Sequence, residues 1–484
     1  MFYLLAILIP LILGALTPIW KFEKGKARVV YVLTSLGLTA VSAGLGLASG
    51  EDFLLARLGG VTLLLGADGL SCFFASLILL AWILTAIFTF RYIAHTGGDD
   101  RFFAFLLLTL GGLLGVCFAR NMVTLYLFFE CATLFSMPLV LHEGTKESIA
   151  AALKYLFYSV GGAFLGLLGV FAVYHYSTDH EFVPGGTLDV SALGDGKNLF
   201  LVMIFLAVIG FATKAGMFPM HAWLPTAHPV APASASAVLS GVITKAGVIA
   251  VIRLVYYTVG IEFLKGTWVQ TTWIILALVT VFMGSMMAYH EKLLKKRLAY
   301  STVSNLSYIL AGLFTLTPEG LLGALLHVAA HLTAKTALFL TAGAIIYKTG
   351  KTKVDELTGI GKEMPAAMWG FTFASLSLVG IPPMAGFISK WHLASAALGA
   401  ELGVLGVMIP VILLVSALLT AGYLLPIVIH GFFPGKDYDY SRPKTEAPAS
   451  MTAPILILAA LALGFGLAAS PLVSFLASAV TSAF

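Results

Sequence analysis

The chain has 484 residues, of which 59% are hydrophobic and only 11% are charged, against about 25% charged in a typical soluble protein. A water-soluble protein of this length has too little interior to bury so much apolar surface. The composition therefore excludes a soluble enzyme, a disordered protein and a nucleic-acid-binding protein. The formal net charge of +5 is better explained by basic loops on one side of a membrane than by an anionic partner. Cys72, Cys117 and Cys131 lie inside apolar runs without a CxxC spacing, so we interpret them as small buried hydrophobic residues.

Apolar runs that are long enough to cross a bilayer follow one another along the whole chain. A hydrocarbon core of about 30 Å needs roughly 20 apolar residues per helix, which predicts about fourteen transmembrane helices in an all-α polytopic membrane protein. In chain order, the predicted helices span residues 2–20, 29–49, 70–94, 102–119, 121–142, 149–176, 198–220, 232–258, 268–289, 298–316, 321–347, 364–394, 402–430 and 451–481. Residues 50–68 are too short and too rich in glycine to span the bilayer, and we expect a surface hairpin there.

Lysine and arginine are unevenly distributed between the predicted loops. The loops after odd-numbered helices hold most of them, with clusters in 21–28, 290–297 and 348–363. The loops after even-numbered helices hold only Arg57, Arg120, Lys197 and Lys265. Because cytoplasmic loops are enriched in basic residues, we expect the first set of loops in the cytoplasm and both chain termini on the outer side.

Several ionisable side chains remain inside the predicted helices. A charge at the bilayer centre costs at least about 2.5–3.5 kcal/mol on insertion scales, so each one needs a partner or a water-lined path. Lys154 and Arg253 lie near helix ends, where they either snorkel to the interface or join the buried set. The residues that we assign to a proton relay or ion path are Glu130, Lys214, Lys245, His327, His331, Lys335 and Lys390.

His327 and His331 stand four residues apart, on one face of the predicted helix 321–347. The same spacing occurs in HExxH metal sites, but the glutamate base is absent and no cysteine or acid nearby completes a ligand set. Haem ligation would need a further histidine on a facing helix, and the other candidates lie at span termini. Imidazoles that titrate near neutral pH, in line with Lys335, fit a proton relay better. We therefore expect no metal and no cofactor in this chain.

Two predicted helices carry helix breakers at membrane depth. The breakers are Gly216 and Pro219 in 198–220, and Gly380, Pro382 and Pro383 in 364–394. Because proline lacks the amide N–H and clashes with the preceding turn, each helix is expected to be discontinuous. A lysine lies close to each break, at 214 and 390, which favours a functional break over a packing kink.

The two breaks occupy matching positions in two units of five helices, 102–258 and 268–430. Because five is odd, consecutive units enter the membrane from opposite sides, so the repeats are expected to be inverted, as in secondary transporters. The expected organisation is completed by residues 1–101, which hold three helices and the hairpin, and by 431–484, which hold a loop and the last helix.

Five motifs give the chain a resemblance to a known family. They are LFFE at 127–130, FATKAGMFPMHAWLPTAHPVAPASASAVLSGVITKAG at 211–247, KKRLAYSTVSNLSYI at 295–309, LLHVAAHLTAKTALF at 325–339 and GIPPMAGFISKW at 380–391. With these motifs the chain resembles the antiporter-like membrane subunits shared by respiratory complex I, Mrp-type cation/proton antiporters, and energy-converting hydrogenases and formate hydrogenlyases. The HPVAP stretch is closer to the hydrogenase branch.

The resemblance implies a role for each central residue. Glu130 and Lys214 match an ion pair that gates proton movement, and Lys245 matches a central relay. His327 and His331 match the next part of that relay. Lys390 matches the residue that links to the exit channel, which is lysine in many members and glutamate in others.

The resemblance also implies a setting in the cell. We expect a proton-translocating or Na⁺/H⁺-exchanging subunit of a redox-driven complex in a prokaryotic cytoplasmic (inner) membrane. Its partners would be the lipid bilayer, other membrane subunits, including further antiporter-like ones, and a peripheral redox arm. That arm would carry the cofactors (Fe–S clusters, and Ni–Fe or flavin), and none is expected in this chain. The alternatives are a D-type component of an Mrp antiporter and a haem- or quinone-binding electron-transfer subunit.

Overall fold

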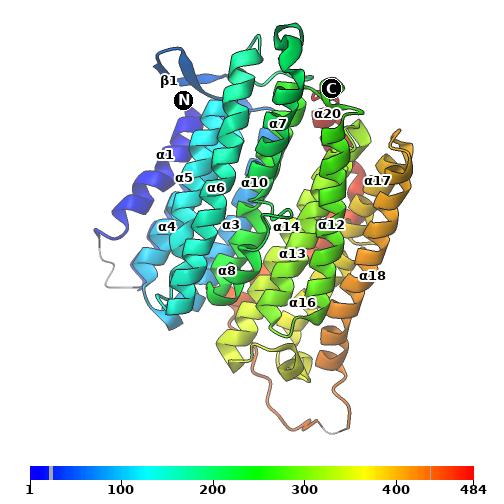
Figure 1. Cartoon of the computed structure of the whole chain (residues 1–484). Helices are drawn as coiled ribbons and strands as arrows, with labels where there is room; N and C mark the ends of the chain where they lie inside the picture. Colours follow the sequence, from blue (N-terminus) through cyan, green and yellow to red (C-terminus); the bar gives the residue numbers. More distant parts are fainter. Residues whose placement is uncertain (21–24, 437) are drawn as a thin grey trace.

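The computed structural model describes residues 1–20, 25–436 and 438–484. Residues 21–24, which belong to a loop predicted to be cytoplasmic, lie outside the described residues. The chain forms a helical bundle whose long helices run roughly side by side (Figure 1). Within the described ranges, 11 helical segments are long and apolar enough to cross a membrane, and three shorter helices are also apolar.

The first part of the bundle contains α1 (Phe2–Leu16), α2 (Gly25–Ser49), α3 (Gly69–Thr96), α4 (Asp99–Phe118), α5 (Met122–Val140) and α6 (Lys146–Tyr176). The middle part contains α7 (Lys197–Ala212), α8 (Leu224–Val230), α9 (Ala233–Val238), α10 (Lys245–Leu254) and α11 (Ile261–Leu264). The last part contains α12 (Trp268–His290), α13 (Leu294–Leu313), α14 (Pro318–Thr349), α15 (Ile360–Glu363), α16 (Pro365–Val379), α17 (Ala385–Gly399), α18 (Val404–Phe432), α19 (Ala449–Leu467) and α20 (Ala469–Thr481).

The segment expected to be a surface hairpin forms two antiparallel strands, β1 (Phe53–Leu58) and β2 (Val61–Leu65). The hairpin is fixed to the start of α5, because the amide of Asn121 donates to the Thr62 carbonyl at 2.9 Å. Figure 1 places the hairpin and both chain termini at the same end of the bundle, which we call the terminal side. The opposite side holds the α12–α13 connection, which pairs with Lys353 beyond α14 through an isolated bridge at Leu293.

Two of the long helical runs are interrupted partway along their length. Helix α7 ends at Ala212 and the next helix begins at Leu224, so the predicted run 198–220 is helical only in its first part. Helix α16 ends at Val379 and α17 begins at Ala385. Gly216 and Gly380 adopt φ values of 72° and 88° at the two interruptions, a conformation that glycine adopts without steric cost.

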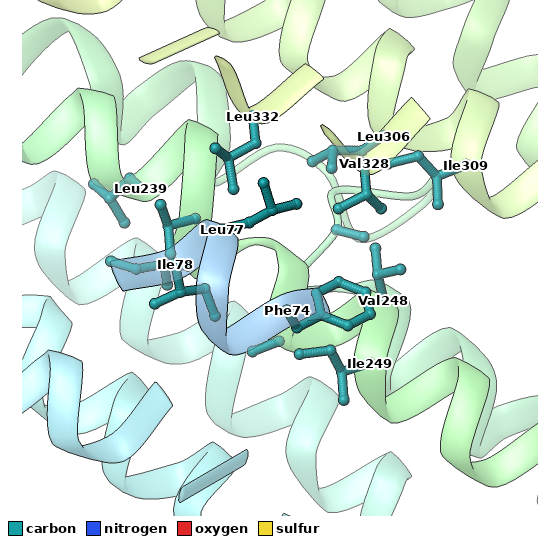
Figure 2. Close-up of a cluster of buried hydrophobic side chains, with 14 of the residues drawn as sticks. Phe74, Leu77, Ile78, Leu239, Val248, Ile249, Leu306, Ile309, Val328 and Leu332 are labelled. Carbon is teal, nitrogen blue, oxygen red and sulfur yellow. The ribbon is translucent and has the colours of Figure 1, made fainter. Parts of the chain in front are cut away.

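The centre of the bundle is formed by α3, α10, α13 and α14. Figure 2 shows their apolar side chains packed together, with Leu77 of α3 beside Leu239 and Val328 of α14 close to Leu306 of α13. The most apolar window of α14 is 94% buried, whereas that of α18 is only 28% buried. Helix α6 likewise exposes Phe157, so α6 and α18 present apolar faces to the surroundings of the bundle.

Two π-helical turns, Leu239–Ile243 and Val255–Val259, lie on either side of α10. Together with α9, they form one continuous span of residues 233–259 that is completely buried. The C-terminal run also differs from expectation, because 451–481 forms α19 and α20 instead of one helix. Pro471, which has no amide N–H to donate to Leu467, lies in the first turn of α20, where a proline is tolerated.

Candidate functional site

The ionisable side chains predicted for the interior lie deep in the bundle. Lys214, Lys245, His327, His331 and Lys335 have relative exposures of 0–1%. Lys214 lies in the interruption after α7, Lys245 begins α10, and the other three lie along α14. Lys390 and Glu130 are partly buried, on α17 and α5. The lysines and histidines are therefore placed by an interruption or by an inner helix, whereas Glu130 lies on α5.

Lys214 is held by hydroxyl groups. Its ammonium donates to Thr133 Oγ1 at 2.8 Å and to the Tyr155 hydroxyl at 2.7 Å, and that hydroxyl lies 2.7 Å from Ser136 Oγ. Glu130 lies one turn before Thr133 on α5, and its buried Oε1 atom has no hydrogen-bond partner among the residues that the structure describes. No ion pair joins Glu130 to Lys214 in the described part of the chain, so the lysine is stabilised here by hydroxyls and the carboxylate stands apart.

Lys245 and His331 are in direct contact. The Lys245 ammonium nitrogen lies 2.7 Å from His331 Nδ1 and donates to the Ser240 carbonyl at 2.8 Å. Ser240 belongs to the π-helical turn that precedes α10. The wider turn directs this carbonyl toward the Lys245 side chain, so the local distortion of the helix creates part of the lysine's binding site.

Lys214 and Lys245 belong to neighbouring elements that approach each other closely. A Cβ atom built at Gly247, two residues beyond Lys245, would lie 2.9 Å from Cβ of Lys214. The glycine therefore allows the interrupted segment after α7 to pack against the first turn of α10. This approach brings the first broken helix next to the central lysine.

The second part of the row joins α14 to α17. His327 Nδ1 lies 2.9 Å from Ser389 Oγ, and the His327 ring stacks on Tyr308 with centroids 5.2 Å apart. The Lys390 ammonium lies 5.0 Å from the centroid of the same Tyr308 ring. It also donates to the carbonyls of Leu378 at 2.6 Å and Val379 at 3.0 Å. Lys390 thus satisfies two carbonyls that the end of α16 leaves free.

Lys335 branches away from this row toward α13. Its ammonium contacts Ser301 Oγ and donates to the Leu298 carbonyl at 3.0 Å. The lysine lies one turn beyond His331 on the same stripe of α14. This position extends the histidine row toward the side of the bundle opposite the termini.

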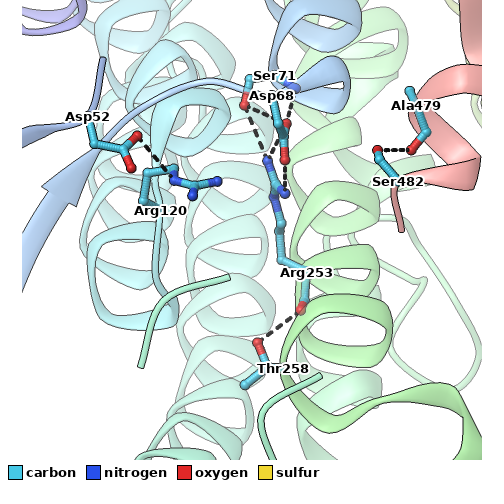
Figure 3. Close-up of polar contacts among 8 residues, drawn as sticks. All are labelled: Asp52, Asp68, Ser71, Arg120, Arg253, Thr258, Ala479 and Ser482. Atoms are coloured by element: carbon cyan, nitrogen blue, oxygen red, sulfur yellow. Dashed lines mark hydrogen bonds and ion pairs between the residues drawn. The ribbon is translucent and has the colours of Figure 1, made fainter. Parts of the chain in front are cut away.

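Lys154 and Arg253, the two basic residues predicted near helix ends, make different kinds of contact. Lys154 donates to Thr226 Oγ1 at 3.0 Å. Arg253 is buried and does not snorkel, because it makes a bidentate contact with Asp68, with Nη1–Oδ2 at 2.5 Å and Nη2–Oδ1 at 2.9 Å (Figure 3). Asp68 also caps α3 by accepting from the Ser71 amide at 2.9 Å. This pair ties α10 to α3 on the terminal side and lies apart from the central row.

The structure adds polar groups that the sequence did not single out. The hydroxyls of Thr133, Tyr155 and Ser389 contact the central row, but isolated hydroxyl residues are common in helices and carry no sequence signal. His228 is completely buried and stacks on Phe339 with centroids 4.7 Å apart, and neither of its ring nitrogens has a hydrogen-bond partner among the described residues. In the sequence, the feature that could have pointed to a buried His228 is its position in an apolar stretch flanked by prolines.

The geometry forms a row of hydrogen-bonding groups through the middle of the bundle. It begins beside Glu130 and Lys214, continues through Lys245 and His331, and reaches His327 and Ser389 on α17. Lysine and histidine can both gain and lose protons, and hydroxyls can pass them on. The arrangement is therefore suited to moving protons within a membrane.

Comparisons with known proteins agree with this architecture. Residues 119–422 match the family model described as NADH:quinone oxidoreductase/Mrp antiporter, transmembrane. The chain is 34% identical over 372 residues to the N subunit of NADH-quinone oxidoreductase from Desulforudis audaxviator, covering 74% of this chain and 72% of the relative. It is 29% identical over 485 residues to the D-type component of the Na(+)/H(+) antiporter from Alkalihalophilus pseudofirmus, covering 98% and 95%.

The fold is also found in a solved structure of a membrane complex. A chain of the Mrp complex from Dietzia sp. DQ12-45-1b superimposes with a TM-score of 0.83 at 22% identity, covering 99% of this chain and 96% of that one. The match to the family model includes the two interruptions and all the central ionisable residues from Glu130 to Lys390. The protein therefore belongs to the NADH:quinone oxidoreductase/Mrp antiporter family of transmembrane subunits.

Proposed function

We propose that this chain translocates protons across the membrane as one subunit of a redox-driven complex related to complex I and the energy-converting hydrogenases. The observation that carries the proposal is a buried row in which Lys245 contacts His331 and His327 contacts Ser389, with the two histidine ring centroids 6.4 Å apart. A lysine lies at each helix interruption. Placing ionisable groups at membrane depth is costly, and a proton path explains why they are retained.

The mechanism that we propose is electrostatic. When Glu130 is ionised and close to Lys214, the attraction favours the charged lysine. When the two groups move farther apart, Lys214 loses that stabilisation and a proton can move toward Lys245. From Lys245 it passes to His331 and His327, and the charge on Lys390 sets when it is released.

The energy source is proposed to lie in partner subunits that carry the redox cofactors. The relative from Desulforudis audaxviator is named as part of a quinone oxidoreductase, and the similar Dietzia chain belongs to an Mrp complex. Helices α6 and α18 also expose apolar faces against which other membrane subunits can pack. We propose that these subunits include further antiporter-like chains.

We further propose that the bundle contains fourteen transmembrane helices arranged as two inverted repeats, 102–258 and 268–430, and that the terminal side is the outer side. The interrupted span in each unit supports the repeats, and the basic loops support the orientation. Cysteine labelling tests the orientation, because an impermeant reagent added to intact cells should label Arg57→Cys in the hairpin and spare Lys436→Cys. Labelling of Lys436→Cys and not of Arg57→Cys would show that the terminal side faces the cytoplasm.

The function is tested with the purified complex in sealed vesicles that contain a pH-sensitive dye. Driving the redox reaction should acidify or alkalinise the lumen, and the signal should vanish in a complex that carries Lys245→Arg in this chain. Redox turnover without any proton movement in the parent complex would refute the proposal.

A second candidate function is cation/proton exchange within an Mrp-type antiporter. It is favoured by the alignment with the D-type component of the Alkalihalophilus antiporter, which spans nearly the full length of both chains. In this case proton movement would require a Na⁺ gradient and would proceed without a redox substrate. Imposing a Na⁺ gradient on vesicles without an electron donor distinguishes the two functions.

A further inference from the structure

The terminal end of α14 carries a carboxylate in line with the buried histidines. Glu319, Gly323, His327, His331 and Lys335 follow one another at intervals of four residues, so successive members are neighbours along a ridge that winds slowly around the helix, and we call this ridge the stripe. Glu319 lies in the first turn of α14. The stripe therefore leads from the interior of the bundle to the helix end at Glu319.

This end of α14 lies on the terminal side of the bundle. Just before α14, the Leu313 carbonyl accepts a hydrogen bond from Tyr256, and the ring of Tyr256 packs against the C-terminal Phe484 with centroids 5.6 Å apart. Helix α17 also reaches this side, where it connects to α18 (Figure 1). The two helices consequently run together toward the same surface.

Two polar contacts join α14 to α17 like successive rungs. The inner contact is His327 Nδ1 with Ser389 Oγ at 2.9 Å. The outer contact is a hydrogen bond between Nδ1 of His392 and Oε1 of Glu319, which becomes an ion pair when the imidazole is protonated. Ser389 and His392 are three residues apart, so they share the face of α17 that packs on α14.

Gly323 lies between the two rungs on α14 and allows the helices to approach. A Cβ atom at this position would lie 2.9 Å from the Leu393 amide nitrogen and 3.1 Å from the His392 carbonyl carbon. Any side chain at position 323 would push α17 away. The glycine therefore holds His392 within reach of Glu319.

Exposure increases from the inner rung to the outer one. His327 and Ser389 are buried, the His392 side chain is 21% exposed, and the Glu319 side chain is 45% exposed. The pair is not required to cap α14, because Thr317 accepts the hydrogen bond from the Gly320 amide. Exposed ion pairs also contribute little to stability. A purely structural role therefore accounts poorly for a titratable pair at this place.

We propose that His392 and Glu319 form the outer proton-release pair of this chain, an inference that rests on the proposed function. A proton that leaves the His327–Ser389 contact binds Nε2 of His392. The imidazole then passes its Nδ1 proton to the carboxylate of Glu319, which releases it to water. One proton enters at Nε2 and one leaves from Nδ1, which leaves the ring protonated on Nε2. The partly exposed ring regains its starting tautomer when water supplies a proton to Nδ1 and takes the proton from Nε2, with no net gain or loss.

The test uses the whole complex in vesicles and two variants that keep the hydrogen-bond partners but cannot carry a proton, Glu319→Gln and His392→Asn. We expect each to slow proton translocation roughly tenfold, because water replaces a positioned acid–base group only partly. Glu319→Asp should recover much of the rate. The slowed variants should also show a larger solvent isotope effect, which a structural defect would not produce.

The matched control is Glu262→Gln, which removes an exposed carboxylate paired with Lys265 and should translocate at the parental rate. Parental rates in both Glu319→Gln and His392→Asn, in a complex whose parent is active, would overturn the release pair alone. A parent complex that moves no protons would overturn the proposed function and this inference together. If His392→Asn fails to assemble, the more exposed Glu319→Gln variant decides the outcome.

Discussion

The side-chain nitrogen of Lys245 lies 2.7 Å from Nδ1 of His331, and both groups are fully buried. A contact of this length requires one hydrogen and one lone pair between the two nitrogens. Lys245 and His331 therefore share a single proton at this position, and charging both nitrogens would break the contact. In the proposed path, the next proton would enter only after the shared one has moved on, so the pair would separate an input part of the path from an output part.

Replacing Lys245 by arginine should stop proton translocation while the complex still assembles. The guanidinium retains the positive charge but does not lose its proton in proteins, so it cannot share a proton with His331. We expect a fall of roughly a hundredfold or more in vesicle proton uptake. Lys245→Met serves as a second variant in case the larger side chain prevents assembly. Lys265→Arg, at an exposed position, should be unaffected, and a fully active Lys245→Arg complex would contradict the relay.

Lys214→Ala and Glu130→Ala should each abolish translocation in an assembled complex. Glu130→Asp should be milder, because it keeps the charge and only shortens its reach. The structure adds Tyr155→Phe, which removes one of the two hydroxyls that hold the ammonium and should reduce the rate without abolishing it. These variants are compared by proton uptake at equal complex content. Normal uptake by the Lys214 variant would exclude the first interruption from the path.

Lys390→Glu should retain partial activity, since a carboxyl group can still carry a proton at this position. Lys390→Met should retain little, because it preserves length but can neither titrate nor donate to the carbonyls of Leu378 and Val379. Proton uptake by vesicles containing each variant distinguishes a charged role from a packing role. Lys436→Met, in an exposed loop, is the control. If the Lys390→Met complex pumps like the parent, the lysine serves only to cap α16.

The ion pair between Arg253 and Asp68 should matter for stability. Asp68→Ala leaves the buried guanidinium of Arg253 unpaired, which we expect to cost about 3–5 kcal/mol, seen as a lower temperature of thermal unfolding. The double variant Asp68→Ala/Arg253→Met should recover most of this loss, because both charges are removed together. A double variant no more stable than Asp68→Ala would show that Arg253 stabilises the fold by other contacts, such as its stacking on Tyr257.

The length of the apolar runs was enough to predict the helical character and most helix positions, because the bilayer imposes a minimum span. The interruptions were harder to place. Pro10, Pro410 and Pro426 all lie inside continuous helices, so proline alone does not end a helix here. Both interruptions contain a glycine with positive φ a few residues before a proline. In the sequence this glycine–proline combination stands out only when the segments 216–219 and 380–383 are compared with each other.

The sequence was enough to predict the buried ionisable residues of the site, but not the groups that form hydrogen bonds with them. Lysine in an apolar run stands out because burying it is costly, so Lys214 and Lys245 were evident from the sequence. The groups that hold them were not, because Thr133 is indistinguishable from any helix threonine until α5 and α7 are packed together. The position of Ser240 as a carbonyl partner depends on a π-helical turn, for which the sequence offers no signature.

That π-helical turn makes the segment before Lys245 one residue longer than a regular helix would need. Each residue in an α-helix advances the side chains by about 100° around the axis. A π-helical turn absorbs one extra residue without this rotation, so deleting one residue from Leu239–Ile243 would convert the turn to regular helix while Lys245 keeps its orientation. No titratable group would be lost, yet the Ser240 carbonyl would no longer be directed at the Lys245 ammonium. The extra residue of this π-turn therefore contributes to the lysine's binding site through its effect on the backbone, whatever its side chain.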